Sequence, residues 1–360
     1  MSRWSPLREP TEISVEKAAA SPRSGVAGVA PRLALTLTVF LAVTVVVCLL
    51  APLIGSTPVH LSRVFDRGIP FAENVDAQVF FIARLPRVVA AAIVGSGLAL
   101  SGVVFQALLR NPLASPDTLG VSAGASLGAV LAITFHADVT LAGVPAVPLA
   151  GFAGSVGALA IVYVLAAARR RGTPGTALLL AGIAISALLA AIGRFIQYFA
   201  DFTDTFRSVQ WLMGSLDVGG YAPILAALVP LTVALAGFAT LPRVLDLLSI
   251  GPESAATRGV DIVRAERVAL VSASLSTGAA VALGGPVLFV GIIVPHIVRL
   301  IVGPEHRLVL PASALFGASF LVVCDLVART ILAPVELPVG IVTAILGGPF
   351  FLWLLFRRVL

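Results

Sequence analysis

Two overlapping G-x-S-x-G patterns are the first feature of the sequence that could carry out a chemical reaction. They run from Gly120 to Gly124 and from Gly124 to Gly128, with Ser122 and Ser126 at their centres. In hydrolases this pattern places a nucleophilic serine between a strand and a helix, with histidine and acidic partners. Here both serines lie in an apolar run that we expect to be helical. Gly120, Gly124 and Gly128 would then share one helix face that a neighbouring helix could approach closely, which favours helix packing over catalysis.

The histidines could define a metal site. The sequence contains His60, His136, His296 and His306. No H-E-x-x-H pattern is present, and Glu305, beside His306, falls in a predicted loop. His296 follows a proline, which predicts a helix bend in which the imidazole bonds to the backbone. The remaining two lie at the ends of apolar runs without a ligand set, so we predict no metal site and no cofactor.

A polar stretch from Ser249 to Arg267 carries six charged side chains in nineteen residues, although only 12% of the chain is charged. Gly251-Pro252-Glu253 predicts a helix start, since proline suits the first position and glutamate the positive end of the dipole. Gly259 predicts its end, and Asp261 can cap the next helix. A helix of about seven residues is not stable alone in water. The stretch is therefore either a docking element, stabilised by a partner or by the fold, or an ordinary amphipathic surface turn.

The composition indicates what surrounds these residues. Of the 360 residues, 58% are hydrophobic, and the chain has 33 glycines and 24 prolines. So few charges cannot cover the surface of a soluble domain of this size, which indicates an integral membrane protein. The net charge of +6 does not indicate a nucleic-acid partner, because the cations separate apolar runs instead of clustering on one face.

A helix needs about 20 apolar residues to cross a membrane. Breaks at charges and at proline or glycine clusters predict ten spans, the third and eighth being short: 33–54, 84–109, 119–136, 141–168, 175–200, 222–241, 265–283, 287–302, 308–332 and 338–356. We predict an all-α, polytopic membrane protein, since lipid offers the backbone no hydrogen-bond partners. Residues 1–31 are expected to be a flexible cytosolic tail and residues 32–360 the transmembrane domain, because no signal-peptide cleavage site follows the first apolar run.

The positive charges predict the orientation. With an even number of spans both termini share one side, which receives 17 of the 24 lysines and arginines. The other side receives Arg63, Arg67, Arg84, Arg87, Arg194, Arg207 and Arg329. Cytoplasmic loops carry the excess of positive charge, so we predict that both termini and the polar stretch are cytosolic.

Three outer arginines, Arg84, Arg87 and Arg329, lie where the second span begins and the ninth ends, so that they could face one mouth. Near the interface they avoid most of the cost of about 2.5–3.5 kcal/mol for an arginine at mid-bilayer. They could bind an acidic partner or extend to lipid headgroups. Arg329 could also pair with Asp325 one turn earlier in its helix.

Several motifs together resemble one family of transporters. They are Arg84 to Arg87, Gln106 to Pro116, Leu119 to Gly124, Trp211 to Leu216, Gly251 to Val260, Gly285 to Arg299, Leu310 to Ser313, Asp325 to Arg329 and Glu336 to Gly340. By these motifs the chain resembles the permeases of ABC importers for iron–siderophore complexes, haem and cobalamin, and the resemblance covers about residues 35 to 358. The first 30 residues fall outside the resemblance.

The resemblance implies a type II ABC importer permease in the cytoplasmic membrane of a bacterium. In that fold two ten-span subunits, identical or homologous, lie between two ATP-binding subunits and an extracytoplasmic substrate-binding protein. Residues 249–260 would be the coupling loop on the ATP-binding subunits, formed chiefly by Gly251, Pro252, Glu253, Ala256, Arg258 and Gly259. Arg84, Arg87 and Arg329 would bind acidic residues of the binding protein. Thr257-Arg258 departs from the more apolar pair of many relatives.

The energy source distinguishes this interpretation from its rivals. The chain has no Walker A pattern, and its single lysine is Lys17. We therefore predict a transport subunit without enzymatic activity, driven by ATP hydrolysis on its partners. An ion-coupled secondary transporter is the alternative, but Asp325, the one carboxylate well inside a predicted span, has Arg329 as a partner. The resemblance favours a ferric siderophore as substrate and leaves cobalamin and haem open.

Overall fold

The computed structural model describes residues 29–137, 139–141, 143–168 and 174–359. The predicted N-terminal tail lies almost entirely outside these residues, as do Arg169, Arg170 and Arg171. Within the described residues, the first helix begins at Val29.

The described residues confirm the all-α membrane fold. Seven helices are long and apolar enough to cross a membrane, and three apolar helices are shorter. Together they correspond to the ten predicted spans: α1 (Val29–Leu50), α4 (Leu85–Leu108), α5 (Val121–Thr134), α6 (Ala146–Ala168), α7 (Pro174–Phe199), α9 (Ala222–Thr240), α12 (Ile262–Gly284), α13 (Val290–Val302), α14 (His306–Thr330) and α15 (Val339–Val359).

The two spans predicted to be short are short in the structure. Helix α5 has 14 residues and α13 has 13. At a rise of 1.5 Å per residue these helices are roughly 20 Å long, less than the hydrocarbon core of about 30 Å. A 3-10 turn, Pro116–Leu119, precedes α5 and supplies part of the missing length.

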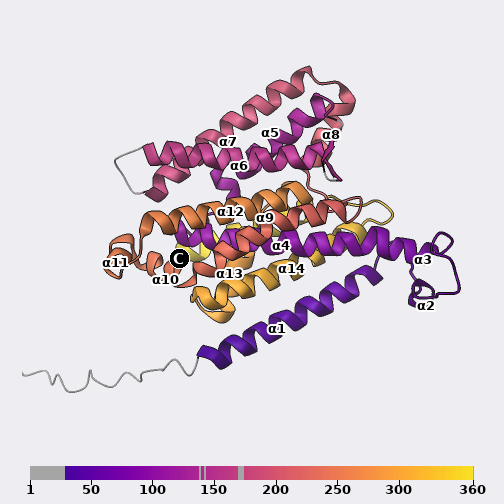
Figure 1. The fold of residues 1–360 in the computed structure, drawn as a ribbon, viewed down its shortest axis with the longest axis horizontal. Coiled ribbons are helices and arrows are strands. Elements are labelled where there is room, and N and C mark those ends of the chain that lie inside the picture. Colours follow the sequence, from indigo (N-terminus) through magenta and orange to yellow (C-terminus); the bar gives the residue numbers. More distant parts are fainter. Residues whose placement is uncertain (1–28, 138, 142, 169–173, 360) are drawn as a thin grey trace, which may run out of the picture.

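Helix α4 forms the centre of the bundle. It packs against α14, α12 and α13, while α5, α6 and α7 form a neighbouring group that reaches the centre chiefly through α6 and α12 (Figure 1). Small residues permit these close contacts. A Cβ atom at Gly95 would collide with the carbonyl oxygen of Gly317 on α14, and one at Gly102 with that of Gly291 on α13.

One end of the bundle, which we name the α8 end, carries elements that the span prediction did not contain. They are α2 (Leu61–Val64), α3 (Val75–Gln78), the π-helical turn Val79–Arg84, the strand pair β1 (Thr140–Leu141) and β2 (Val144–Pro145), and α8 (Phe202–Leu212). Helix α8 is amphipathic, so it lacks the continuous apolar run by which the spans were recognised.

The opposite end, which we name the α11 end, carries α10 (Pro242–Ile250) and α11 (Pro252–Thr257). Figure 1 shows the beginning of α1 and the C-terminal end of the chain at this same end. This arrangement agrees with an even number of crossings.

Candidate functional site

Helices α10 and α11 form a compact unit between the two spans α9 and α12. Gly251 separates them with φ of 146°, and Gly259 ends α11 with φ of 80°, a backbone conformation that other residues rarely adopt. Asp261 caps α12, since its side chain accepts a hydrogen bond from the Arg264 N–H at 3.0 Å. The helix start, its glycine end and the following cap lie where the sequence predicts them.

A small hydrophobic cluster holds α11 in place. Ala255 is fully buried and packs with Leu248 of α10 and Ala265 of α12. Val260 and Ile262 cover this cluster. The fold therefore stabilises α11 even though so short a helix is unstable in isolation.

The opposite face of α11 is open to solvent. Glu253 and Ala256 are exposed on it, and Arg258 and Gly259, directly after α11, are exposed as well. Ile250 and Val263, which flank the unit, are 65% and 54% exposed. We name this surface, from Ile250 to Val263, the α11 surface.

At the α8 end, a buried carboxylate joins two of the three predicted arginines. Asp325 has no exposed surface. Its Oδ1 accepts a hydrogen bond from Nε of Arg87 at 2.8 Å, and its Oδ2 lies 3.4 Å from Nε of Arg329. Arg87 also reaches Glu336, with 2.6 Å between Nη1 and Oε2. The pairing of Arg329 with Asp325 is thus present, within a larger network.

The remaining contacts of Arg84 and Arg329 are with backbone carbonyls. Arg329 donates from Nη2 to the Ala51 oxygen at 2.6 Å. Arg84 donates from Nη1 to the Pro52 oxygen at 3.1 Å, and from Nη2 to the Thr57 oxygen. Both arginines therefore hold the segment that follows α1. They are 6% and 4% exposed, so their guanidinium groups face protein and do not extend to lipid headgroups.

Arg87 is the one of these three arginines that lines an open space. A cavity of about 600 Å³ lies at the α8 end, with Arg87, Arg207, Trp211, Asp217 and Glu336 in its walls. The loop after α8 closes one side, because Ser215 N–H donates to the Gly284 oxygen at 3.0 Å and Leu216 is fully buried. The cavity thus brings together three motifs that are distant in the sequence, around Arg87, Trp211 and Glu336.

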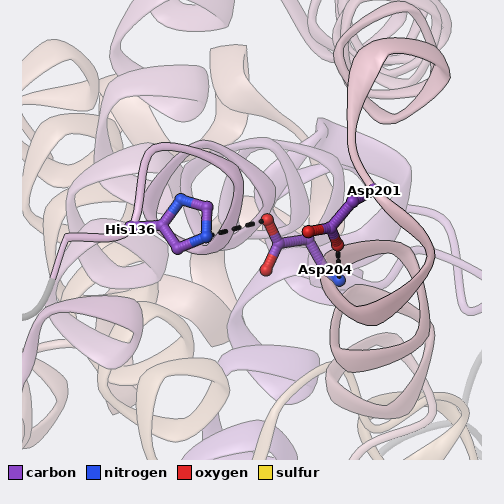
Figure 2. Close-up of side chains that lie close together, drawn as sticks. All are labelled: His136, Asp201 and Asp204. Carbon is purple, nitrogen blue, oxygen red and sulfur yellow. Dashed lines mark hydrogen bonds and ion pairs between the residues drawn. The ribbon is translucent and has the colours of Figure 1, made fainter.

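His136 is not isolated, contrary to the sequence interpretation. It lies beside Asp201 and Asp204, and ligand atoms of the three residues are within 4.8 Å of one another. Figure 2 shows the His136 ring directed at Asp204, whose Oδ2 is 3.4 Å from Nε2. Asp201 accepts from the Asp204 N–H at 2.7 Å as the cap of α8. These contacts explain the cluster as a connection between α5 and the start of α8.

The G-x-S-x-G serines also have structural roles. Helix α5 follows a 3-10 turn and not a strand, and Ser122 donates to Asp117 of that turn. Ser126 donates to the backbone oxygen of Ser122 at 2.7 Å.

The three glycines of those patterns have different surroundings. A Cβ atom at Gly124 would collide with the Gly154 oxygen, and one at Gly128 with the Ala150 oxygen, both on α6. Gly120 lies before the helix with φ of 84° and faces Gly182 and Ser186 of α7 at looser distances. Gly124 and Gly128 thus form the close contact with α6, whereas Gly120 forms a turn.

His306 was expected near a loop and instead begins α14. Its ring and its backbone N–H both contact Asp246 of α10. His296 lies in α13, 5.9 Å from the Phe350 ring between centroids. No pattern in the sequence connects His306 with Asp246, because 60 residues separate them.

Comparisons with known proteins agree with these features. The model of the FecCD transport family matches residues 43–357. The cobalamin import system permease of Halobacterium salinarum is 45% identical, covering 83% of this chain and 79% of that protein. The hemin transport system permease of Yersinia pestis is 40% identical, covering 78% of this chain and 84% of that protein.

Two further comparisons extend this result. The Fe(3+) dicitrate transport system permease of Escherichia coli is 40% identical over 76% of this chain and 84% of that protein. A solved structure described as an inward-facing metal-chelate type ABC transporter superimposes with a TM-score of 0.76 at 32% identity, covering 89% of this chain and 98% of that one.

Proposed function

This chain belongs to the FecCD transport family, and from that premise we propose that it is the membrane subunit of an ATP-driven importer for a ferric siderophore. The family match carries the transport part of the proposal, because residues 43–357 include the end of α1, all or nearly all of the other nine spans, the α11 surface and the arginine network. Proteins of this family are permeases, so the role of the chain is transport. ATP hydrolysis belongs to partner subunits.

The α11 surface is the contact for an ATP-binding subunit. Two permease chains therefore bind two ATP-binding subunits, one on each α11 surface. Two features of α11 support this assignment: one face is packed against α10 and α12, and the other face is exposed to solvent. Ala255 anchors α11 to α10 and α12, while Glu253, Ala256, Arg258 and Gly259 remain exposed. A short helix held on its neighbours can transmit a push without bending. The α11 end and both termini are then cytosolic.

The cavity at the α8 end is the place where a substrate-binding protein delivers its cargo. Arg87 lines it and is available at its wall, whereas Arg84 and Arg329 act by holding residues 51–57 in position. All three predicted arginines therefore contribute to docking. Arg87 contacts the binding protein, and Arg84 and Arg329 hold the segment after α1 in the position that docking requires. Positive charge at the contact speeds docking and fixes its register more than it raises affinity.

Transport proceeds by alternating access. A loaded binding protein docks at the α8 end, ATP-driven closure of the cytosolic subunits moves α11, and the bundle opens towards the cytosol. A second permease subunit, either an identical chain or a homologue, completes the pathway. The buried pairing of Asp325 with Arg87 and Arg329 leaves that carboxylate unsuited to binding a coupling ion, which disfavours a secondary transporter.

Cobalamin is the second candidate substrate. The 45% identity to a cobalamin import permease favours it, and cobalamin, like a ferric siderophore, is a bulky metal chelate. Haem is the third, through the 40% identity to a hemin permease.

Uptake by the complete transporter distinguishes these substrates. Proteoliposomes with the permease, the ATP-binding subunits and the binding protein are supplied with labelled ferric siderophore, cobalamin or haem. We expect ATP-dependent accumulation of the ferric siderophore. If only cobalamin or only haem accumulates, that compound replaces the ferric siderophore as the proposed substrate. If none of the three accumulates, the proposal that the chain imports such compounds is contradicted.

The docking role of Arg87 has a separate test. Arg87→Gln should slow association of the binding protein with the reconstituted transporter by roughly tenfold at low salt, since charge complementarity acts mainly on the association rate. Arg67→Gln is the matched control, because Arg67 is an exposed arginine at the same end of the molecule. Equal rates for both variants would remove Arg87 from the docking contact.

A further inference from the structure

Resting on the function proposed above, we infer that Asp246 of α10 caps α14 from outside that helix and thereby couples the α11 surface to α14. The inference concerns a positioning residue, since Asp246 acts through the helix that it holds.

The contact consists of two hydrogen bonds to one oxygen atom. Oδ1 of Asp246 accepts from the backbone N–H of His306 at 3.0 Å and lies 2.7 Å from Nδ1 of the same residue. A carboxylate can only accept, so Nδ1 carries the proton in this contact. His306 is 5% exposed, whereas the Asp246 side chain is 35% exposed, so the contact lies at the edge of the protein interior with the histidine on its buried side.

The position of His306 gives these bonds their effect. It is the first residue of α14, and its N–H is one of the groups that a helix cannot pair internally. The residue that would normally supply a cap, Glu305, makes no side-chain cap bond. Asp246 therefore takes over the role of an N-cap, and its negative charge also favours the positive end of the helix dipole.

The first turn of α14 depends on this cap more than an ordinary turn would. Pro311 lacks the N–H that would bond to the carbonyl of residue 307, so the turn has one fewer connection to the rest of the helix. Leu308, Val309 and Leu310 are buried in the bundle. A displacement of this first turn of α14 would therefore also displace the residues of the bundle that pack against it.

The contact between Asp246 and His306 connects the α11 surface with the arginine network at the α8 end. Asp246 lies in the same helix as Leu248, which packs against Ala255 of α11. Helix α14 continues to Arg329, where Asp325 and Arg329 belong to the network at the α8 end. A force on α11 thus reaches the start of α14 through α10 and one carboxylate, and α14 leads to the outer arginines.

The test compares Asp246→Ala with Asp246→Asn in the reconstituted transporter. The number of ATP molecules hydrolysed per substrate imported should rise at least about tenfold for Asp246→Ala, because the substitution removes both hydrogen bonds to the carboxylate and the loss of one such bond already corresponds to about that factor. Asp246→Asn should remain within about twofold of the unchanged protein, since its one carbonyl oxygen can accept both bonds. Thr240→Ala is the control, because Thr240 is exposed and its hydroxyl donates within α9 to Gly237.

Hydrogen–deuterium exchange of the full chain provides a readout that does not need transport. Amides 306–309 should exchange faster in Asp246→Ala, and as in the unchanged protein in Asp246→Asn. If Asp246→Ala does not assemble, His306→Ala replaces it, and we expect a smaller change in the same direction because its backbone bond remains.

The outcomes separate the inference from the proposed function. Absence of ATP-driven uptake by the unchanged protein would contradict the function, while the exchange result would still test the cap. Normal coupling and normal exchange in Asp246→Ala would overturn the inference. So would an Asp246→Asn variant as impaired as Asp246→Ala, because the two bonds would then not account for the effect.

Discussion

At the scale of single residues, Asp325 is a buried carboxylate that lies between two arginines. Its carboxylate is fully buried and depends on Arg87 and Arg329 for compensation. Glu336 joins the same network, but its side chain is 50% exposed. The two carboxylates therefore share a partner while differing in burial, which makes them a matched pair.

Asp325→Ala should destabilise the purified chain by about 3–5 kcal/mol, because it leaves buried arginines without their counter-charge. Glu336→Ala should cost no more than about 1 kcal/mol, as for an exposed ion pair. Denaturant titration of the full chain in detergent measures both. Equal losses for the two variants would contradict the assigned burial.

At the scale of elements, α5 and α6 lie so close together that backbone atoms of α6 leave no room for a side chain at Gly124 of α5. A Cβ atom at Gly124 would lie 2.5 Å from Cβ of Ala158 and would also collide with the Gly154 oxygen. A Cβ atom at Gly157, on the same helix α6, would meet no atom within 4 Å. The same substitution thus tests close packing at one position and open space at the other.

Gly124→Ala should lower the stability of the chain by about 1–3 kcal/mol, the usual effect of overpacking. Gly157→Ala should leave it unchanged or raise it by up to about 1 kcal/mol, because alanine favours a helix. Thermal unfolding of both variants measures the difference. A Gly124→Ala variant as stable as Gly157→Ala would show that the helices can separate without cost.

The α11 surface can be blocked without disturbing its base. Ala256 is exposed, whereas its neighbour Ala255 is fully buried. Ala256→Trp should weaken binding of the ATP-binding subunits at least about tenfold, or 1.4 kcal/mol, with unchanged stability of the chain. Ala72→Trp, at an exposed alanine of the α8 end, is the control. Unchanged affinity for Ala256→Trp would exclude this surface as the contact.

The elements also show how far the sequence could be used to predict the structure. The spans could be predicted because charges, prolines and glycines bound their apolar runs: α9 was expected at 222–241 and lies at Ala222–Thr240. Helix α8 was missed because its apolar side chains occupy one face only. The local punctuation around Gly251 and Gly259 was sufficient to predict α11.

The contacts within the candidate sites could not be predicted from the sequence. Arg329 donates to Ala51, 278 residues away, and His306 binds Asp246 at a separation of 60. Such contacts depend on which helices become neighbours, and residue spacing does not contain that information. For this reason the three arginines could be predicted to lie near one mouth, while the burial of Arg84 and Arg329 could not.

At the scale of the whole molecule, burial differs strongly between helices. Of an 18-residue stretch in each, 78% is buried in the region of α4, but only 6% in α1 and 11% in α7. Apolar helices so exposed need lipid or another subunit around them. A membrane and a second permease subunit, as proposed, would cover these faces.

The proposed orientation has a direct test in chains whose own cysteines, Cys48 and Cys324, are replaced by alanine. Ala72→Cys should react with a membrane-impermeant maleimide in intact cells, while Ser249→Cys, exposed beside α11, should react only after permeabilisation. The expected pattern follows from the positive charges at the α11 end. Labelling of Ser249→Cys in intact cells would place α11 outside the cell and contradict its role.

The central claim is that this chain is driven by a separate ATPase, and switching the energy source tests it most directly. Sealed proteoliposomes contain either this chain alone with a proton or sodium gradient, or this chain with its ATP-binding subunits, binding protein and ATP. We predict that labelled metal chelate accumulates only in the second case and stops when ATP is replaced by a non-hydrolysable analogue. Accumulation by the chain alone on an ion gradient would contradict the account.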